Sequence, residues 1–222
     1  MSVENLADSF VIKFSEVALN YESEVILSDV NLEIKKEDSV SIIGRSGTGK
    51  STLLRSIVGE IKPSVGDISS RGKVSFVFQE PTLVPWLTVA ENIKIVQSSK
   101  KNLDIDRILF EVGLEGFRNR YPNSLSGGQK SRVGLARALA VKPDILLMDE
   151  PFSSLDALTR LEMQNLEKNL QKEHKWTSLI VTHDIEEALT MSKRVIVVKN
   201  GTCFELEGNL TEEVLKDELG VK

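Results

Sequence analysis

Eight residues near the start of the chain have the spacing of a phosphate-binding loop. The segment Gly44-Arg-Ser-Gly-Thr-Gly-Lys-Ser51 matches the pattern G-x-x-x-x-G-K-[ST] in full. Backbone N–H groups of such a turn form an anion-binding nest, and the helix that follows directs its positive end at the phosphates. Lys50 can reach the β- and γ-phosphates, and the Ser51 hydroxyl can ligate Mg²⁺. The predicted nucleotide-binding residues are Gly44, Arg45, Ser46, Gly47, Thr48, Gly49, Lys50, Ser51 and Thr52.

The context of this loop favours a nucleotide site over its simpler alternative, a tight glycine-rich turn with a solvated lysine. The apolar run Val40-Ser-Ile-Ile43 reads as a buried strand before the loop. Residues 52–58 read as a helix after it, stopped by Gly59. A strand, a glycine-rich turn and a helix in this order are the arrangement that phosphate binding needs.

Two adjacent acids, Asp149 and Glu150, follow a continuously apolar stretch at residues 145–148. Such a stretch is typical of a parallel strand buried on both faces. Ligand-binding groups of open α/β sheets lie at the carboxyl ends of strands. We therefore expect Asp149 to face a hydrated Mg²⁺ and Glu150 to face an attacking water. The alternative is a solvated pair of acids in the loop before Pro151.

A third motif, Leu125-Ser-Gly-Gly-Gln129, begins a predicted helix that extends to about residue 141. Ser126 with Gln129 three residues later forms a capping box, which explains the pattern without any ligand. A capped helix amino terminus is also an anion site, so the structural role and a binding role are compatible.

The order of the predicted elements indicates an α/β fold with a mainly parallel sheet. Strands alternate with helices through the second half of the chain. Residues of about 10–43 read as an amino-terminal antiparallel β region, and those of about 80–140 as an inserted, mostly helical lobe. We expect one domain over residues 1–222, with the remainder forming a P-loop NTPase core.

Composition narrows the classes of function. The chain has 222 residues and a formal net charge of −5, which disfavours nucleic acid as the main partner. Cys203, the single cysteine, fits a reducing compartment. The acidic segment 1–8 lacks the pattern of a signal peptide, and no apolar run approaches the ~18 residues of a membrane span.

Together, the loop at 44–51, the 125–129 motif and the acids after strand 145–148 resemble the ATPase subunits of ATP-binding-cassette (ABC) transporters. The resemblance covers about residues 10–206. It implies that Tyr21 stacks on adenine, although a half-buried strand aromatic is the alternative. It further implies a Q-loop at Gln79, a D-loop at residues 153–156, and a switch histidine at His183.

The resemblance also implies how the site works. ATP and Mg²⁺ are bound, with Glu150 and His183 as the catalytic residues. Two copies form a head-to-tail homodimer that sandwiches ATP between the P-loop of one and the 126–129 helix end of the other. The remaining binding residues are then Tyr21, Gln79, Ser126, Gly127, Gly128, Gln129 and Asp156, and the metal ligands are Ser51, Gln79 and Asp149.

The segment 79–92 resembles that of the bacterial importers of nitrate, sulfonates and taurine. This implies docking to membrane permease subunits through the Trp86 region, a solute-binding protein in the complex, and a peripheral location on the cytoplasmic face of the membrane. The alternative for Trp86 and Leu87 is packing within the helical lobe. Two rival functions are an ABC ATPase outside transport, in assembly or nucleic-acid maintenance, and a nucleotide-gated module without turnover.

Overall fold

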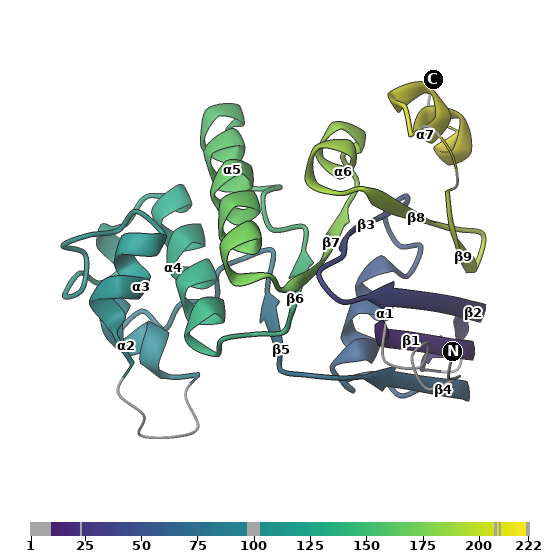
Figure 1. The fold of residues 1–222 in the computed structure, drawn as a ribbon, viewed down its shortest axis with the longest axis horizontal. Helices are drawn as coiled ribbons and strands as arrows, with labels where there is room; N and C mark the ends of the chain where they lie inside the picture. Colours follow the sequence, from purple (N-terminus) through teal and green to yellow (C-terminus); the bar gives the residue numbers. More distant parts are fainter. Residues whose placement is uncertain (1–9, 23, 97–102, 207, 209, 221–222) are drawn as a thin grey trace, which may run out of the picture. The chain divides into compact units, whose positions relative to one another are not determined.

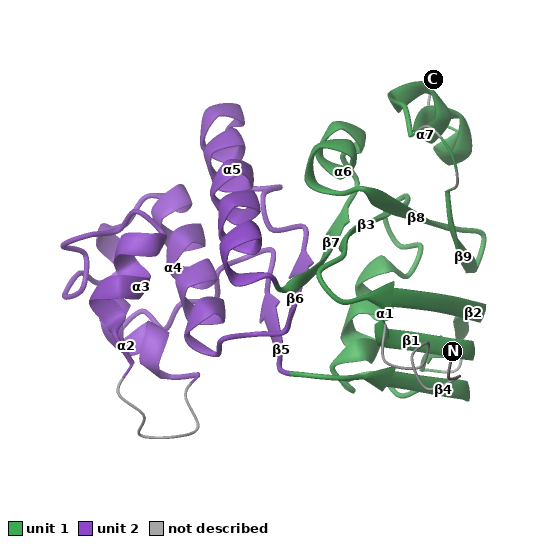
Figure 2. Ribbon diagram, in the orientation of Figure 1, with its two compact units in different colours: residues 1–72, 176–222 green, residues 73–175 purple. Residues whose placement is uncertain are grey.

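The computed structural model describes residues 10–22, 24–96, 103–206, 208 and 210–220. These residues form two compact units (Figure 2): unit 1 contains residues 1–72 and 176–222, and unit 2 contains residues 73–175. The acidic segment 1–8, without a signal-peptide pattern, lies outside the described residues. Across the described ranges, none of the helices has both the length and the apolar character that crossing a bilayer requires.

Unit 1 contains an antiparallel sheet in the order β2-β1-β4 (Figure 1). Alternating burial explains the two long strands, because side chains such as Ile12 and Phe14 point to the core while their neighbours face outward. The edge strand β4 has five exposed residues among six and no alternation, which is why its sequence did not predict a strand. The strands are β1 (Phe10–Tyr21), β2 (Glu24–Lys35) and β4 (Val65–Ser70).

The parallel strands of unit 1 carry the phosphate-binding loop. The central strand β3 (Ser39–Ile43) pairs in parallel with β7 (Thr177–Thr182) on one side and with β8 (Arg194–Lys199) on the other. β9 (Thr202–Glu205) joins β8 antiparallel. Asn200 and Gly201 form the two-residue turn of this hairpin, with φ angles of 53° and 77°, as a type I′ turn requires. The helices are α1 (Lys50–Ile57), α6 (Ile185–Met191) and α7 (Glu212–Leu219).

Unit 2 combines two parallel strands with a group of helices. β5 (Val74–Val77) pairs in parallel with β6 (Ile145–Asp149). The longest helices, α4 (Gly127–Ala140) and α5 (Ala157–His174), pack against each other. α4 also contacts the two short helices α2 and α3. The others are α2 (Val89–Lys94), α3 (Ile105–Glu111) and a 3₁₀ turn (Pro122–Ser124). The helical lobe expected at about 80–140 therefore corresponds to α2, α3 and α4.

The expected fold class is confirmed. Parallel strands alternate with helices, as in a P-loop NTPase core, and an antiparallel β region and a helical region are both present. The antiparallel region differs in membership from the expected range of about 10–43. It gains β4, and β3 pairs in parallel instead, because four of its five residues are buried, as in a strand covered on both faces.

Candidate nucleotide-binding site

The phosphate-binding loop occupies the turn between β3, which ends at Ile43, and α1, which begins at Lys50. The Lys50 side chain is 5% exposed. Its Nζ donates to the carbonyl oxygens of Gly44 and Arg45, each at 2.9 Å. The ammonium is thus held over the loop, close to the backbone that would surround a phosphate.

Gly49 is required by the geometry of this loop. It has a φ of 100°, which L side chains rarely adopt, and a Cβ there would lie 2.6 Å from Cγ2 of Ile26 in β2. A larger residue would therefore have to strain its backbone and displace β2. The last loop residue before the helix can only be glycine if the loop is to keep this path.

His183 lies at the same edge of the parallel sheet as the loop. Ile43 of β3 and Thr182 of β7 are register partners, so the residues that follow them, Gly44 and His183, lie at the same edge of the sheet. The Thr182 hydroxyl donates to the carboxylate of Glu187, which is only 6% exposed. Glu187 was missed from the sequence, although its place three residues after the helix cap Asp184 was a detectable signal.

Tyr21 ends β1 in unit 1, with an exposed fraction of 62%. The alternative interpretation was an aromatic residue half-buried in a strand, and Tyr21 is more exposed than that. An exposed aromatic ring is available for stacking on a planar base. Its role toward adenine stays a prediction.

Arg45 uses its side chain differently from the expected phosphate contact. Its guanidinium donates to the carbonyl oxygens of Leu219 and Gly220 at the end of α7, at 3.1 and 2.9 Å. A phosphate contact from Arg45 would therefore come from its backbone N–H.

A second group of predicted site residues lies at the strand ends of unit 2. Val77 of β5 and Met148 of β6 are register partners, so Gln79 and the acids Asp149 and Glu150 follow the same edge. Glu150 has a φ of 45°, in the left-handed region that a non-glycine residue adopts at a cost and often at functional sites.

Ser153 links the two loops at this edge and was not among the predicted binding residues. The Gln79 side-chain amide donates to Ser153 Oγ at 3.3 Å, and Ser153 Oγ donates to the Glu150 carbonyl at 2.9 Å. Ser153 lies in the segment identified as a D-loop, but a serine hydroxyl in a loop carries no sequence signal for this bridging position.

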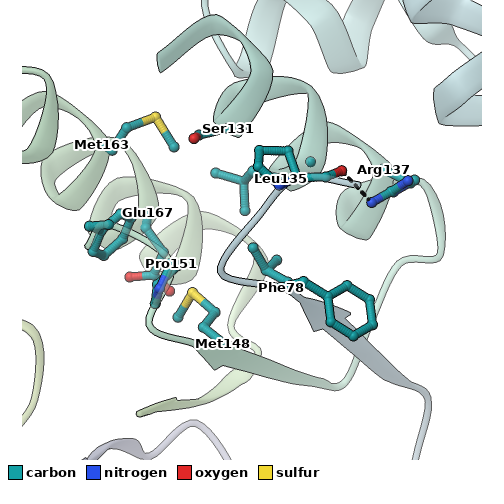
Figure 3. Close-up of a pocket in the computed structure, with 12 residues that line it drawn as sticks. Phe78, Ser131, Leu135, Arg137, Met148, Pro151, Met163 and Glu167 are labelled. Atoms are coloured by element: carbon teal, nitrogen blue, oxygen red, sulfur yellow. Dashed lines mark hydrogen bonds between the residues drawn. The ribbon is translucent and has the colours of Figure 1, made fainter. Parts of the chain in front are cut away.

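A small cavity lies behind these loops within unit 2 (Figure 3), lined by residues of α4, α5 and the ends of β5 and β6. Its volume of about 20 Å³ suits one water molecule. Phe78 and Pro151, which adjoin Gln79 and Glu150, form part of its wall. Arg137 crosses to the Q-loop segment, where Nη2 donates to the Pro81 carbonyl at 2.9 Å.

The 125–129 motif forms the expected capping box at the start of α4. The Gln129 N–H donates to Ser126 Oγ at 3.3 Å, and the Ser126 N–H donates to Gln129 Oε1 at 3.0 Å. Gly128 allows close helix packing, because a Cβ there would lie 2.4 Å from the methyl group of Thr159 in α5.

Asp156 caps α5 beside this helix start. Its carboxylate accepts from the Thr159 N–H at 3.1 Å and from the Thr159 hydroxyl at 2.6 Å. The Thr159 hydroxyl holds the pKa of Asp156 below its usual value. Asp156 therefore stays ionised as a cap, and its predicted role toward nucleotide stays untested.

The predicted residues thus form two groups, one in each unit. The structure brings together the P-loop and His183 in unit 1. In unit 2 it brings together Gln79, Asp149 and Glu150 at the strand ends, and Ser126–Gln129 with Asp156 at two helix starts.

The residues present fit a magnesium nucleotide. In unit 1 a buried ammonium lies over a glycine-rich loop whose path excludes a Cβ at Gly49, and the backbone N–H groups of such a loop are the donors that bind phosphate oxygens. The predicted metal ligands Ser51, Gln79 and Asp149 offer hydroxyl, amide and carboxylate oxygens, the hard donors that Mg²⁺ prefers.

Comparisons with known proteins agree with this geometry. The family model described as ABC transporter matches residues 27–153. An aliphatic sulfonates import ATP-binding protein, SsuB, of Burkholderia pseudomallei is 42% identical over 86% of this chain. This chain spans 60% of that relative's length. A second such protein, SsuB 3 of Paraburkholderia xenovorans, is 41% identical over 91% of this chain and 85% of its own.

Solved structures agree as well. The cbiO1 protein of Clostridium perfringens, part of the cbiONQ transporter complex, superposes with a TM-score of 0.84 at 30% identity, covering 95% of this chain and 92% of its own. The ATP-binding cassette MJ0796, solved as a dimer with ADP and Pi, gives 0.76 at 34% identity, covering 89% of this chain and 100% of its own. With a matching family model over more than half its length and relatives above 40% identity, this chain belongs to the ABC transporter ATP-binding family.

Proposed function

We propose that this protein is the ATP-hydrolysing subunit of a membrane transporter that imports aliphatic sulfonates or related small solutes. The observation that carries the proposal is the P-loop, in which the buried Lys50 ammonium lies 2.9 Å from two loop carbonyls and Gly49 has a φ that favours glycine. The sulfonate importers among the relatives support the solute class.

Each residue has a distinct task in this proposal. Bound Mg-ATP supplies the phosphoanhydride bond whose cleavage releases free energy. Lys50 and the loop N–H groups hold the phosphates, and Ser51 and Asp149 provide oxygen ligands for the metal. Glu150 accepts a proton from the attacking water, while His183, from the strand beside the P-loop, donates a hydrogen bond to the terminal phosphate.

The proposed assembly is first a homodimer with ATP between the P-loop of one copy and the Ser126 helix end of the other. Second, this dimer docks on permease subunits at the cytoplasmic face of the membrane, with a solute-binding protein in the complex. The dimeric cassette among the structural relatives supports the first part. The import function in the names of the sequence relatives supports the second. Trp86, which is 75% exposed in unit 2, is available for a partner.

Substitution of Lys50 tests the proposal. Lys50→Ala should abolish tight Mg-ATP binding and phosphate release, because it removes charge-assisted hydrogen bonds to the phosphates. Arg55→Ala, which removes an exposed cation from the same helix, is the matched control. Wild-type kcat/KM in Lys50→Ala would overturn the assignment of this loop.

A further inference from the structure

The backbone of Arg45 connects several parts of the phosphate-binding loop. Its carbonyl oxygen accepts hydrogen bonds from Lys50 Nζ at 2.9 Å and from the Thr48 hydroxyl at 2.9 Å. The Thr48 N–H also points to it, at 3.4 Å. This one carbonyl therefore helps to position both the Lys50 ammonium and Thr48 in the middle of the loop.

The side chain of Arg45 connects the same residue to the end of α7, far along the chain. Nε donates to the Leu219 carbonyl at 3.1 Å, and Nη2 donates to the Gly220 carbonyl at 2.9 Å. The last carbonyls of a helix have no partner within the helix, and the negative end of its dipole attracts a cation. The guanidinium donates to one such carbonyl, that of Leu219, and to the carbonyl of the capping residue Gly220 just beyond the helix, through a rigid pair of donors.

α7 can serve as an anchor because it is itself fixed to the core of unit 1. Leu215 and Leu219 are buried in a cluster with Ile43, Ala188, Val195 and Val197. A hollow of about 210 Å³ separates parts of the loop and the helix, lined by Arg45, Thr48, Val198, Lys199, Asn200, Leu219 and Gly220. Beside this hollow, the two hydrogen bonds of the Arg45 side chain connect the loop with the end of α7.

We propose that Arg45 is a positioning residue that ties the P-loop to α7, so that ATP binding and the order of α7 favour each other. The path runs from the α7 carbonyls through the Arg45 side chain to its carbonyl, and from there to Lys50 and Thr48. Since coupling between two sites is reciprocal, ATP in the loop stabilises α7 by the same factor by which an ordered α7 strengthens ATP binding. The inference rests on the proposed ATP-binding function.

The test is amide hydrogen exchange on the full chain, with and without Mg-ATP, together with steady-state ATPase kinetics. In the wild type, Mg-ATP should slow exchange in α7, residues 212–219. Arg45→Ala should remove this effect and raise the Kd and KM for ATP about tenfold, the scale of one hydrogen bond to a charged group. The loss should be larger in KM than in kcat, because saturating ATP itself favours the ordered loop.

Two further variants separate positioning from general stability. Arg45→Lys keeps a cation at the helix end and should restore part of the affinity and of the ATP effect on α7. Arg55→Ala, the exposed arginine of α1, should match the wild type in both measurements. The wild-type exchange experiment keeps the proposal testable even if Arg45→Ala folds poorly.

Two results would overturn the inference: ATP binding that leaves α7 exchange unchanged in the wild type, or a full ATP effect on α7 in Arg45→Ala. Failure of the proposed function gives a different pattern. In that case the wild type itself would neither bind nor hydrolyse ATP.

Discussion

Ile43 and Thr182 pair in register on two adjacent parallel strands, which places the first residue of the phosphate loop and His183 at one edge of the sheet. The two residues are far apart in sequence, and neither is a ligand. Their pairing nevertheless places His183, the first residue after β7, beside the loop that contains Lys50. In the proposed mechanism the side chains of Lys50 and His183 face the same phosphates.

The first prediction concerns dimer formation. Gly127→Asp should prevent ATP-dependent dimerisation, because a carboxylate at the α4 start would repel the γ-phosphate of the partner's nucleotide. Apart from its own helical turn, none of the described residues has an atom within 4 Å of a Cβ built at Gly127, so the fold should tolerate the change, and Gly127→Ala is the size control. Sedimentation in a Glu150→Gln background should show dimers with ATP, but not with ADP, for the parent and for Gly127→Ala. A normal ATP-dependent dimer of Gly127→Asp would refute the sandwich arrangement.

The second prediction concerns permease docking. Trp86 is 75% exposed, so its side chain packs little against the lobe of unit 2. Replacing Trp86 and Leu87 with Ala should weaken co-purification with the permease and leave basal ATPase activity near the wild-type level, since neither is a phosphate ligand. Phe110→Ala, an exposed aromatic of α3, is the control and should assemble normally. Undiminished assembly of the double variant would argue against docking through this segment.

The third prediction concerns the link between the Q-loop and the acidic loop. Ser153→Ala removes the hydrogen bonds to Gln79 and to the Glu150 carbonyl. Each such bond contributes on the order of 1 kcal/mol, so kcat should fall about 5- to 30-fold while the Kd for Mg-ATP changes little. Ser154→Ala, at the exposed neighbouring position, should behave as the wild type. An unchanged kcat in Ser153→Ala would show that this bridge does not support catalysis.

The fourth prediction concerns Cys203. Burial raises the pKa of its thiol to about 12, so the thiol stays protonated and unreactive at pH 8. The native protein should react with a maleimide far more slowly than the urea-unfolded chain, in which an exposed cysteine has a pKa of about 8.5. Labelling at pH 8 should accelerate as urea unfolds the protein and exposes the thiol. Equal native and unfolded rates at pH 8 would show that the thiol is accessible.

Local patterns were sufficient to predict much of this fold. The continuous apolar runs of β3 and β6 predicted buried parallel strands, and the Ser126–Gln129 box predicted the start of α4. β4 was missed because Val65–Ser70 carries no alternation, and only its pairing with β1 makes it a strand. Local signals cannot supply such long-range pairing.

The candidate site divides in the same way. The phosphate loop was predictable because its glycines and lysine are constrained by one local geometry. The side-chain direction of Arg45 was not, since its carbonyl partners Leu219 and Gly220 are brought near only by the packing of α7. Ser153 and Glu187 were missed because each acts by holding a loop that carries another residue, although Glu187 had a local signal in its place three residues after the cap Asp184.

Single-turnover hydrolysis by Glu150→Gln, with ATP binding measured in parallel, tests the central claim most directly. Glutamine keeps the shape of the site but accepts a proton poorly, so the variant should bind Mg-ATP well and hydrolyse it about 10²–10⁴-fold more slowly, the range of a positioned general base. Asp149→Asn should instead weaken the Mg²⁺ dependence of binding. If Glu150→Gln binds ATP and retains more than about a tenth of wild-type turnover, Glu150 is not the base and the proposed mechanism is wrong.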